Sequence, residues 1–154
     1  MSEISDEFPG PTPHVVAAGT DAAIRFYQEA FGADELIRNR TADGRIMHCE
    51  LLLLGGRLLV ADDFEADPVS SPARLGGTSV RLHLYVSDVD EIYARALATG
   101  ATGLVEPYDA FWGDRYAMIR DPVGHLWSFG SGHDDLALAE VEGRADTWSQ
   151  QHPT

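Results

Sequence analysis

Two histidines occupy corresponding places in a duplicated sequence. His14 and His83 each lie in a short apolar run that is followed by an acidic residue, a helical stretch and a Gly-Ala pair. An imidazole can act near neutral pH as a metal ligand, a general base or a hydrogen-bond partner. Because each copy is too small to bury its own sheet face, we expect the two copies to pair and to enclose a functional space between them.

Strand parity predicts which side chains of the second copy share this space with His83. In residues 79–86 the aliphatic side chains at alternate positions would pack on a helix. The opposite side of that strand carries Arg81, His83 and Tyr85, and these three are predicted to bind a ligand. In the last strand, Ser128 is expected to point inward between two core aromatic residues.

Aromatic and charged residues surround a Gly-Asp turn near the expected mouth of the space. Phe111, Trp112 and Arg115 would together clamp a flat or carbonyl-bearing ligand. Two other roles stay open. Aromatic residues at a strand entrance also serve the core or a dimer contact, and Arg115 also suits an ion pair with Asp114 or Asp121.

Glu50 is a candidate general base because it shares a strand face with His48, and burial would raise the pKa of its carboxyl group. A solvated or salt-bridged carboxylate is the alternative at this position. The chain lacks a Gly-x-Ser-x-Gly elbow, a phosphate-binding glycine-rich loop before a helix and a paired-cysteine zinc motif. Hydrolase and nucleotide-binding functions are therefore not indicated.

Each copy predicts one helix and four strands, which makes the expected fold class α+β with two βαβββ modules. The first helix is expected to have Asp21 as its N-cap and to end at Gly32, and the second to end at Gly100. Asp-Gly and Gly-Gly pairs suit tight hairpins between the later strands of the first copy. The expected strands are residues 13–18, 36–40, 46–54 and 57–62 in the first copy, and 79–86, 102–107, 116–120 and 125–129 in the second.

Composition predicts five segments along the chain. The region between the two copies is rich in Pro, Gly, Asp and Ser, which is typical of a linker. The final segment carries scattered apolar residues and is expected to form a helix that docks on the body or on a partner chain. The expected segments are a flexible N-terminal stretch at 1–11, a first module at 12–63, a linker at 64–78, a second module at 79–132, and a C-terminal helix and tail at 133–154.

The formal net charge of −14 would repel nucleic-acid phosphates and anionic lipid over most of the surface. The most apolar window, residues 51–61, is too short to cross a bilayer as a helix. The lone Cys49 cannot form an internal disulfide, and the N-terminus is acidic where a secretory signal would be basic. These features predict a soluble, cytoplasmic protein that binds neither nucleic acid nor membrane.

Three stretches carry a resemblance to a known superfamily. They are Asp21-Ala-Ala-Ile-Arg-Phe-Tyr-Gln-Glu-Ala-Phe-Gly-Ala, Leu82-His-Leu-Tyr-Val-Ser-Asp-Val-Asp, and Phe111-Trp-Gly-Asp-Arg-Tyr-Ala-Met-Ile-Arg-Asp-Pro-Val-Gly-His-Leu-Trp-Ser-Phe. Across residues 12–132 the chain resembles the vicinal oxygen chelate superfamily of glyoxalases, bleomycin resistance proteins and dioxygenases, and within it the PhnB-like branch. The resemblance implies paired βαβββ modules that curl into a cup-like mixed sheet, usually in a homodimer.

In the metal enzymes of this superfamily, the resemblance implies inward His and carboxylate ligands around a divalent cation such as Zn, Ni, Mn or Fe. Ser128 stands where the last strand usually carries a Glu, and Arg81 stands at the usual His position of the second module. A guanidinium group there would repel a cation and favour a carboxylate, phosphonate or phenolate. A shifted ligand set of His14, Glu50 and His83 is the alternative.

Superfamily membership leaves the chemistry open, so the site residues must decide between two functions. The favoured one is a glyoxalase/bleomycin-resistance-like protein that binds a small organic molecule in the cup without a catalytic metal, in a sequestration or orphan role. Arg81 and Ser128 favour this function. The alternative is a divalent-metal-dependent lyase, isomerase or epimerase that acts on vicinal oxygens, and the repeat-related pair His14 and His83 favours it.

Overall fold

The first half of the chain forms one four-stranded sheet with a helix on one face. The computed structural model describes residues 10–132 and 136–152. The sheet has the strand order β1-β4-β3-β2, in which β1 runs parallel to β4 and the other neighbours are antiparallel. Its elements are β1 (His14–Ala17), α1 (Thr20–Phe31), β2 (Asp34–Arg40), β3 (Ile46–Leu53) and β4 (Gly56–Asp62).

The second half repeats this arrangement. Its sheet has the order β5-β8-β7-β6, again with one parallel pair, β5 with β8, at an edge. The elements are β5 (Arg81–Tyr85), α3 (Val89–Ala98), β6 (Thr102–Asp109), β7 (Asp114–Arg120) and β8 (Leu126–Gly132). The predicted α+β fold with two βαβββ units is therefore confirmed.

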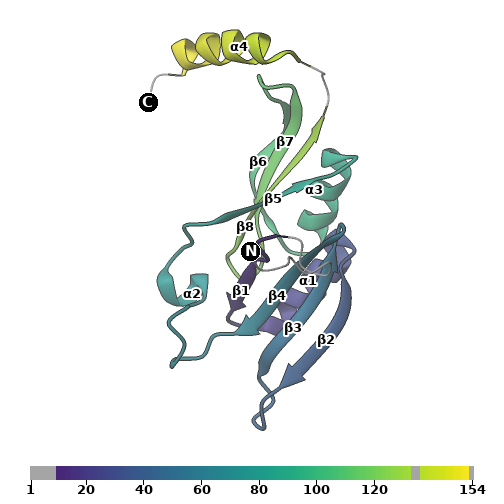
Figure 1. Cartoon of the computed structure of the whole chain (residues 1–154), viewed down its shortest axis with the longest axis vertical. Helices are drawn as coiled ribbons and strands as arrows, with labels where there is room; N and C mark the ends of the chain where they lie inside the picture. The colour runs from purple at the N-terminus through teal and green to yellow at the C-terminus, as the bar shows by residue number, and fades with distance from the viewer. Residues whose placement is uncertain (1–9, 133–135, 153–154) are drawn as a thin grey trace, which may run out of the picture.

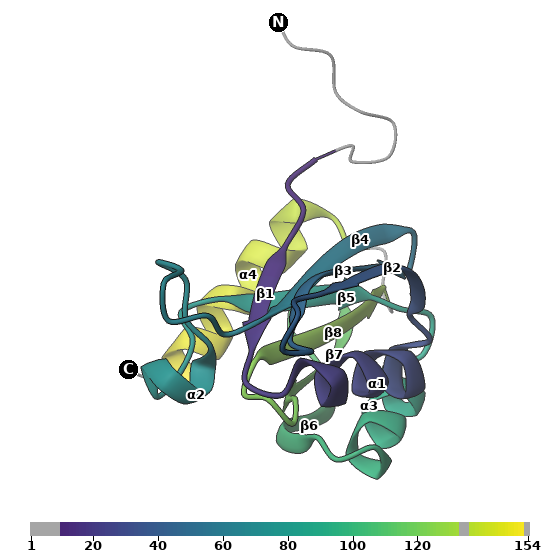
Figure 2. The same cartoon turned by 90° about the horizontal axis from the view of Figure 1, so that it is seen from below.

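The two sheets do not share a hydrogen-bonded edge within the chain, as the described strands pair only inside their own sheet. The units meet instead through their helix-bearing sides, where α1 and α3 lie side by side (Figures 1 and 2). Phe31 at the end of α1 packs on Trp127 and Phe129 of β8, with ring centroids 4.9 and 5.7 Å apart. One apolar core thus extends through both units.

A buried carboxylate ties the units together beside this core. Asp121 accepts hydrogen bonds from the Tyr27 hydroxyl of α1 (2.7 Å) and from the Trp127 indole N–H (3.0 Å). Its other oxygen accepts from the backbone N–H groups of Val123 and His125. Burial, together with the negative charge of Asp121, raises the pKa of Tyr27 well above its usual value, so this hydroxyl stays a donor.

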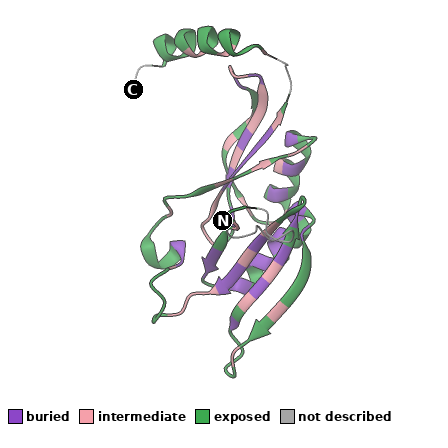
Figure 3. Cartoon of the chain, in the orientation of Figure 1, coloured by how far each residue is buried: buried purple, intermediate pink, exposed green. Residues whose placement is uncertain are grey.

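Two further helices lie outside the two βαβββ units. α2 (Pro72–Leu75) interrupts the segment expected to be a linker, and Ser71 caps it by accepting from the Arg74 N–H. α4 (Leu138–Gln151) crosses the far end of the second sheet, and Figures 1 and 3 show that it is largely exposed. The expected C-terminal helix is therefore present, although residues 133–135 lie outside the described part. No helix within the described ranges combines the length and apolarity needed to traverse a bilayer.

One helix start differs from the expectation. α1 begins at Thr20 after Gly19, whose φ of 93° is left-handed, and no side chain caps it. Asp21 is therefore not the N-cap; it lies in the first turn and pairs with Arg38 and Arg40 of β2. A carboxylate in the first turn still interacts favourably with the helix dipole, which explains why the sequence signal looked like a cap. Gly32 ends α1 in a left-handed conformation as predicted.

Candidate functional site

Each sheet has one face that carries a helix and one that does not. On the second sheet, Trp127 and Phe129 of β8 and Ala117 and Ile119 of β7 are buried against the α3 side. Residues at alternate positions therefore point to the opposite side, which we call the second free face. Strand register arranges them in three rows: Arg81, Leu126 and Arg120; then His83, Ser128 and Met118; then Tyr85, Gly130, Tyr116 and Tyr108.

His83 lies at the centre of the second free face. Its Nδ1 is 2.7 Å from the Ser128 hydroxyl oxygen, and its ring stacks at 6.3 Å on Tyr116. Gly130 lies below the ring, because a Cβ there would come within 3.0 Å of the His83 Nε2. Partial burial and the positive charge of Arg81 lower the pKa of His83 below 6.5, so the imidazole is mostly neutral at pH 7.

Aromatic side chains cover the end of the face beyond His83. Tyr85 contacts His83 edge to face at 4.9 Å, and its hydroxyl donates to Asp114. The indole N–H of Trp112 donates to the same carboxylate, at 3.0 Å, while its ring lies 5.5 Å from Tyr116. Asp114 thus fixes two aromatic groups around an exposed surface.

Most of the residues that we predicted to bind a ligand come together here. Arg81, His83, Tyr85 and Ser128 share the second free face, and Trp112 borders it. Phe111 lies at the β6–β7 turn, where it contacts Trp112 and also packs on Trp148 of α4. Its ring therefore joins α4 to the edge of the face.

Arg115 does not join this group. It lies on the helix-bearing side of β7, where its guanidinium pairs with Asp90 of α3 (2.8 Å) and with Asp109 of β6 (3.1 Å). These partners differ from the expected Asp114 and Asp121, because β7 begins at Asp114 and its alternation then assigns position 115 to the side of α3.

Sequence reasoning missed the three residues that β7 contributes to the face, namely Tyr116, Met118 and Arg120. The available signal was their alternation with the buried Ala117 and Ile119. Parity was applied to residues 79–86 and to the last strand but not to residues 116–120, where the same rule identifies all three.

The free face of the first sheet carries a different set of groups. His14 and His48 have ring centroids 6.3 Å apart, and Glu50 lies 3.2 Å from the His48 Nε2. Glu50 also accepts from the Arg57 guanidinium at 2.8 Å. Burial and the nearby His48 lower the pKa of His14. Because Glu50 is committed to an ion pair, the salt-bridged alternative describes it better than a poised general base.

The ligand set His14, Glu50 and His83 is not assembled within one chain, since its members lie on two separate sheets. Within the described part, no three His, Cys, Asp or Glu side chains gather closely enough to hold a metal ion. The Ser128 hydroxyl, which stands in the expected carboxylate position, is occupied by its bond to His83. These donors do not fit a divalent cation on the second free face.

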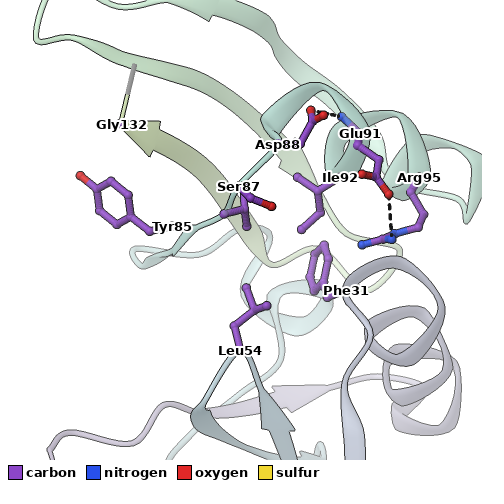
Figure 4. A pocket seen from close by; sticks show the side chains of 10 residues that line it. Phe31, Leu54, Tyr85, Ser87, Asp88, Glu91, Ile92, Arg95 and Gly132 are labelled. Carbon is purple, nitrogen blue, oxygen red and sulfur yellow. Dashed lines mark hydrogen bonds and ion pairs between the residues drawn. The ribbon is translucent and has the colours of Figure 1, made fainter. Parts of the chain in front are cut away.

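A recess of about 600 Å³ opens where the two units meet near the end of β5 (Figure 4). Phe31 and Leu54 form its apolar wall. The polar groups of α3 that line it already have partners, because Asp88 caps the helix and Glu91 pairs with Arg95. This recess therefore offers few polar groups for recognising a ligand.

Comparisons with known proteins agree with this fold. The chain is 39% identical over 137 residues to an uncharacterised protein of Mycobacterium bovis, covering 87% of this chain and 90% of that protein. The structure of TioX from a Micromonospora species matches with 36% identity and a TM-score of 0.61 over 80% of this chain and 99% of TioX. The fosfomycin resistance protein FosX of Listeria monocytogenes has the same fold at 17% identity, with a TM-score of 0.64, over 86% of this chain and 96% of FosX.

A family model extends this likeness from single proteins to a superfamily whose members bind small molecules, often form dimers and often use divalent metals. The match covers residues 13–129, which include every strand of both sheets except the last residues of β8. The chain therefore belongs to the Glyoxalase/Bleomycin resistance protein/Dioxygenase superfamily.

Proposed function

We propose that this protein binds a small organic molecule on the second free face, without a catalytic metal, and serves to sequester it. The observation that carries the proposal is the convergence of Arg81, the His83–Ser128 pair and the Tyr85 and Trp112 rings on one sheet face. A guanidinium, a neutral imidazole and aromatic rings recognise a flat molecule with oxygen acceptors.

The cup requires a second copy of the chain in this proposal. Tyr85 is 67% exposed in the single chain, and apolar Ile37, Met47 and Leu52 are exposed on the first sheet. β1 and β5 each pair with a neighbour on one side only, so each has a free edge that invites further pairing. We propose a homodimer in which the first sheet of one copy covers the second free face of the other.

A ligand screen with matched histidine variants tests the binding function. Thermal shifts are measured with a panel of aromatic acids, phenols and neutral aromatics on the wild type, His83→Ala and His152→Ala. We expect at least one class to raise the Tm of the wild type and of His152→Ala, which changes an exposed imidazole just after the end of α4, but not of His83→Ala. Equal shifts in all three proteins would contradict this site.

Sedimentation velocity tests the homodimer at micromolar concentrations. We expect the mass of two chains. Met47→Asp, which introduces a charge on the exposed apolar surface of the first sheet, should shift the protein towards the monomer and also weaken ligand binding. A monomeric wild type that binds ligand with full affinity would rule out the closed cup.

The metal-dependent lyase, isomerase or epimerase is the second candidate, and one observation favours it. His14, His48 and Glu50 share a face of the first sheet, so a second copy could bring His83 towards them. Metal analysis after purification without a chelator separates the two functions. We expect far less than one metal ion per chain, whereas near-stoichiometric Zn, Ni, Mn or Fe that is lost in His83→Ala would establish the second candidate.

A further inference from the structure

Two arginines on the second free face differ from most others in the protein. The chain has 25 acidic residues against 11 basic ones, and all eleven basic residues are arginines. Seven of them form ion pairs in the described part: Arg38, Arg40, Arg45, Arg57, Arg74, Arg95 and Arg115. Within the described ranges neither Arg81 nor Arg120 has a carboxylate at ion-pair distance, despite the excess of acids.

Strand register brings these two arginines to one row. Arg81 of β5 and Arg120 of β7 both pair with Leu126 of β8, which lies between them. Neighbouring strands are about 4.8 Å apart, so the two Cα atoms are separated by roughly 10 Å. Arginine stems are long enough to bring both guanidinium groups over the leucine between them.

The surroundings favour an anion at this place. Leu126 and Met118 form an apolar floor, and the Arg81 Nη1 contacts the Met118 Sδ at 3.7 Å. Charge-assisted hydrogen bonds strengthen above such a floor because fewer water molecules compete for the donors. Arg120 and Leu126 also line a recess of about 540 Å³ beside the row, which has room for an oxyanion group.

We propose that Arg81 and Arg120 form an anion-binding subsite for the phosphonate, phosphate or carboxylate group of the ligand. The ring of the ligand then lies on the row that contains Tyr85, Tyr116 and Tyr108. The inference rests on the proposed ligand-binding function and defines the ligand class further. A molecule with an oxyanion at one end and an aromatic ring at the other matches the order of the rows, which runs from arginines through His83 to Tyr85 and Tyr116.

Isothermal titration with three related probes tests the subsite. Phenylphosphonate, benzoate and benzamide share a ring and differ in the charge of the attached group. We expect affinity to fall in that order, and the affinity for phenylphosphonate to fall with rising salt because two guanidinium groups neutralise it. Equal affinities for phenylphosphonate and benzamide, or no binding of phenylphosphonate, would overturn the subsite.

Charge-neutral variants then locate the effect. Arg81→Gln and Arg120→Gln should each weaken phenylphosphonate binding about tenfold, since a charge-assisted pair contributes roughly 1.5 kcal/mol, and should weaken benzamide binding much less because its carbonyl group carries no charge. Arg25→Gln is the matched control, because Arg25 is exposed on α1 and also lacks an ion pair in the described part. An equal loss in all three variants would reduce the effect to net charge and overturn the subsite.

The same titrations distinguish this subsite from the proposed function as a whole. If benzamide or another neutral aromatic binds the wild type and not His83→Ala, the ligand-binding face stands even when the anion order fails. Arg120→Lys separates charge from geometry, since an ammonium group keeps the charge but cannot form the bidentate pair. It should recover only part of the affinity that Arg120→Gln loses.

Discussion

The free faces of the two sheets have the same strand arrangement but differ in the charge of the groups that they carry. In the first sheet one row reads His14, Leu59 and Glu50, and in the second the first row reads Arg81, Leu126 and Arg120. Both rows place a leucine on the central strand and a basic group on the edge strand. The third strand carries a carboxylate in one sheet and a guanidinium in the other.

The partners of these groups sharpen the difference. Glu50 is neutralised by Arg57 and contacts His48, whereas Arg120 has no such counter-charge among the described residues. The helix-bearing faces, in contrast, remain alike, with apolar stripes from α1 and α3 in one shared core. The repeat thus keeps the packing side constant, and the open sides are where the two units differ.

The largest expected effect concerns the helix-bearing side, where the two units share one core. Asp121→Ala would leave the buried Tyr27 and Trp127 donors without their acceptor, and we expect it to lower the free energy of unfolding by about 3 kcal/mol or more. Urea denaturation measures this change. Arg81→Gln on the second free face should cost less than about 0.5 kcal/mol. Similar losses in both variants would remove the distinction between a packing side and an open side.

The next effect concerns the floor of the second free face. Gly130→Ala would introduce a Cβ within 3.0 to 3.3 Å of His83 and Tyr85, so both rings must shift. We expect phenylphosphonate affinity to fall several-fold with only a small change in Tm. Gly132→Ala is the control, because a Cβ there meets no atom within 4 Å. Unchanged affinity in Gly130→Ala would show that ring placement on this face is unimportant.

A smaller effect concerns the pKa values of His83 and His14, each of which depends on the charges near it on its own sheet face. The pKa of His83 should lie below 6.5, and Arg81→Gln should raise it towards that value because the nearby positive charge is removed. The pKa of His14, which is lowered by burial and by His48, should not respond to Arg81→Gln. NMR titration of the imidazole protons measures both values. Equal responses would indicate a general charge effect.

The smallest effect is the dependence of stability on pH. Because the folded pKa values of His14 and His83 lie below the unfolded value of 6.5, the unfolded chain binds more protons near pH 6. Stability should therefore decrease continuously as the pH drops through 6.5 towards the folded pKa values. A double His14→Asn and His83→Asn variant should show a flatter Tm profile between pH 7.5 and 5.5.

Local patterns predicted the strands and the face of β5 correctly, because period-two alternation between Leu82, Leu84 and their neighbours depends on the sheet having one packed side. Arg115 was grouped with the ligand-binding residues because the start of its strand was placed at residue 116, which left Arg115 in the preceding turn and not on the strand face where it pairs with Asp90. The hydrogen bond from Tyr27 to Asp121 had no local signal, since the two residues are 94 positions apart in the chain.

The duplicated pattern of apolar and polar residues determined by itself that this chain folds as two βαβββ units, because each unit's helix and sheet alternation is encoded over short stretches. The tertiary structure alone decided that the units join through α1, α3 and Asp121 and leave both opposite faces open. It also decided that Arg81 and Arg120, 39 positions apart, share one row. Strand register and packing between distant segments set these relations, and no local spacing contains them.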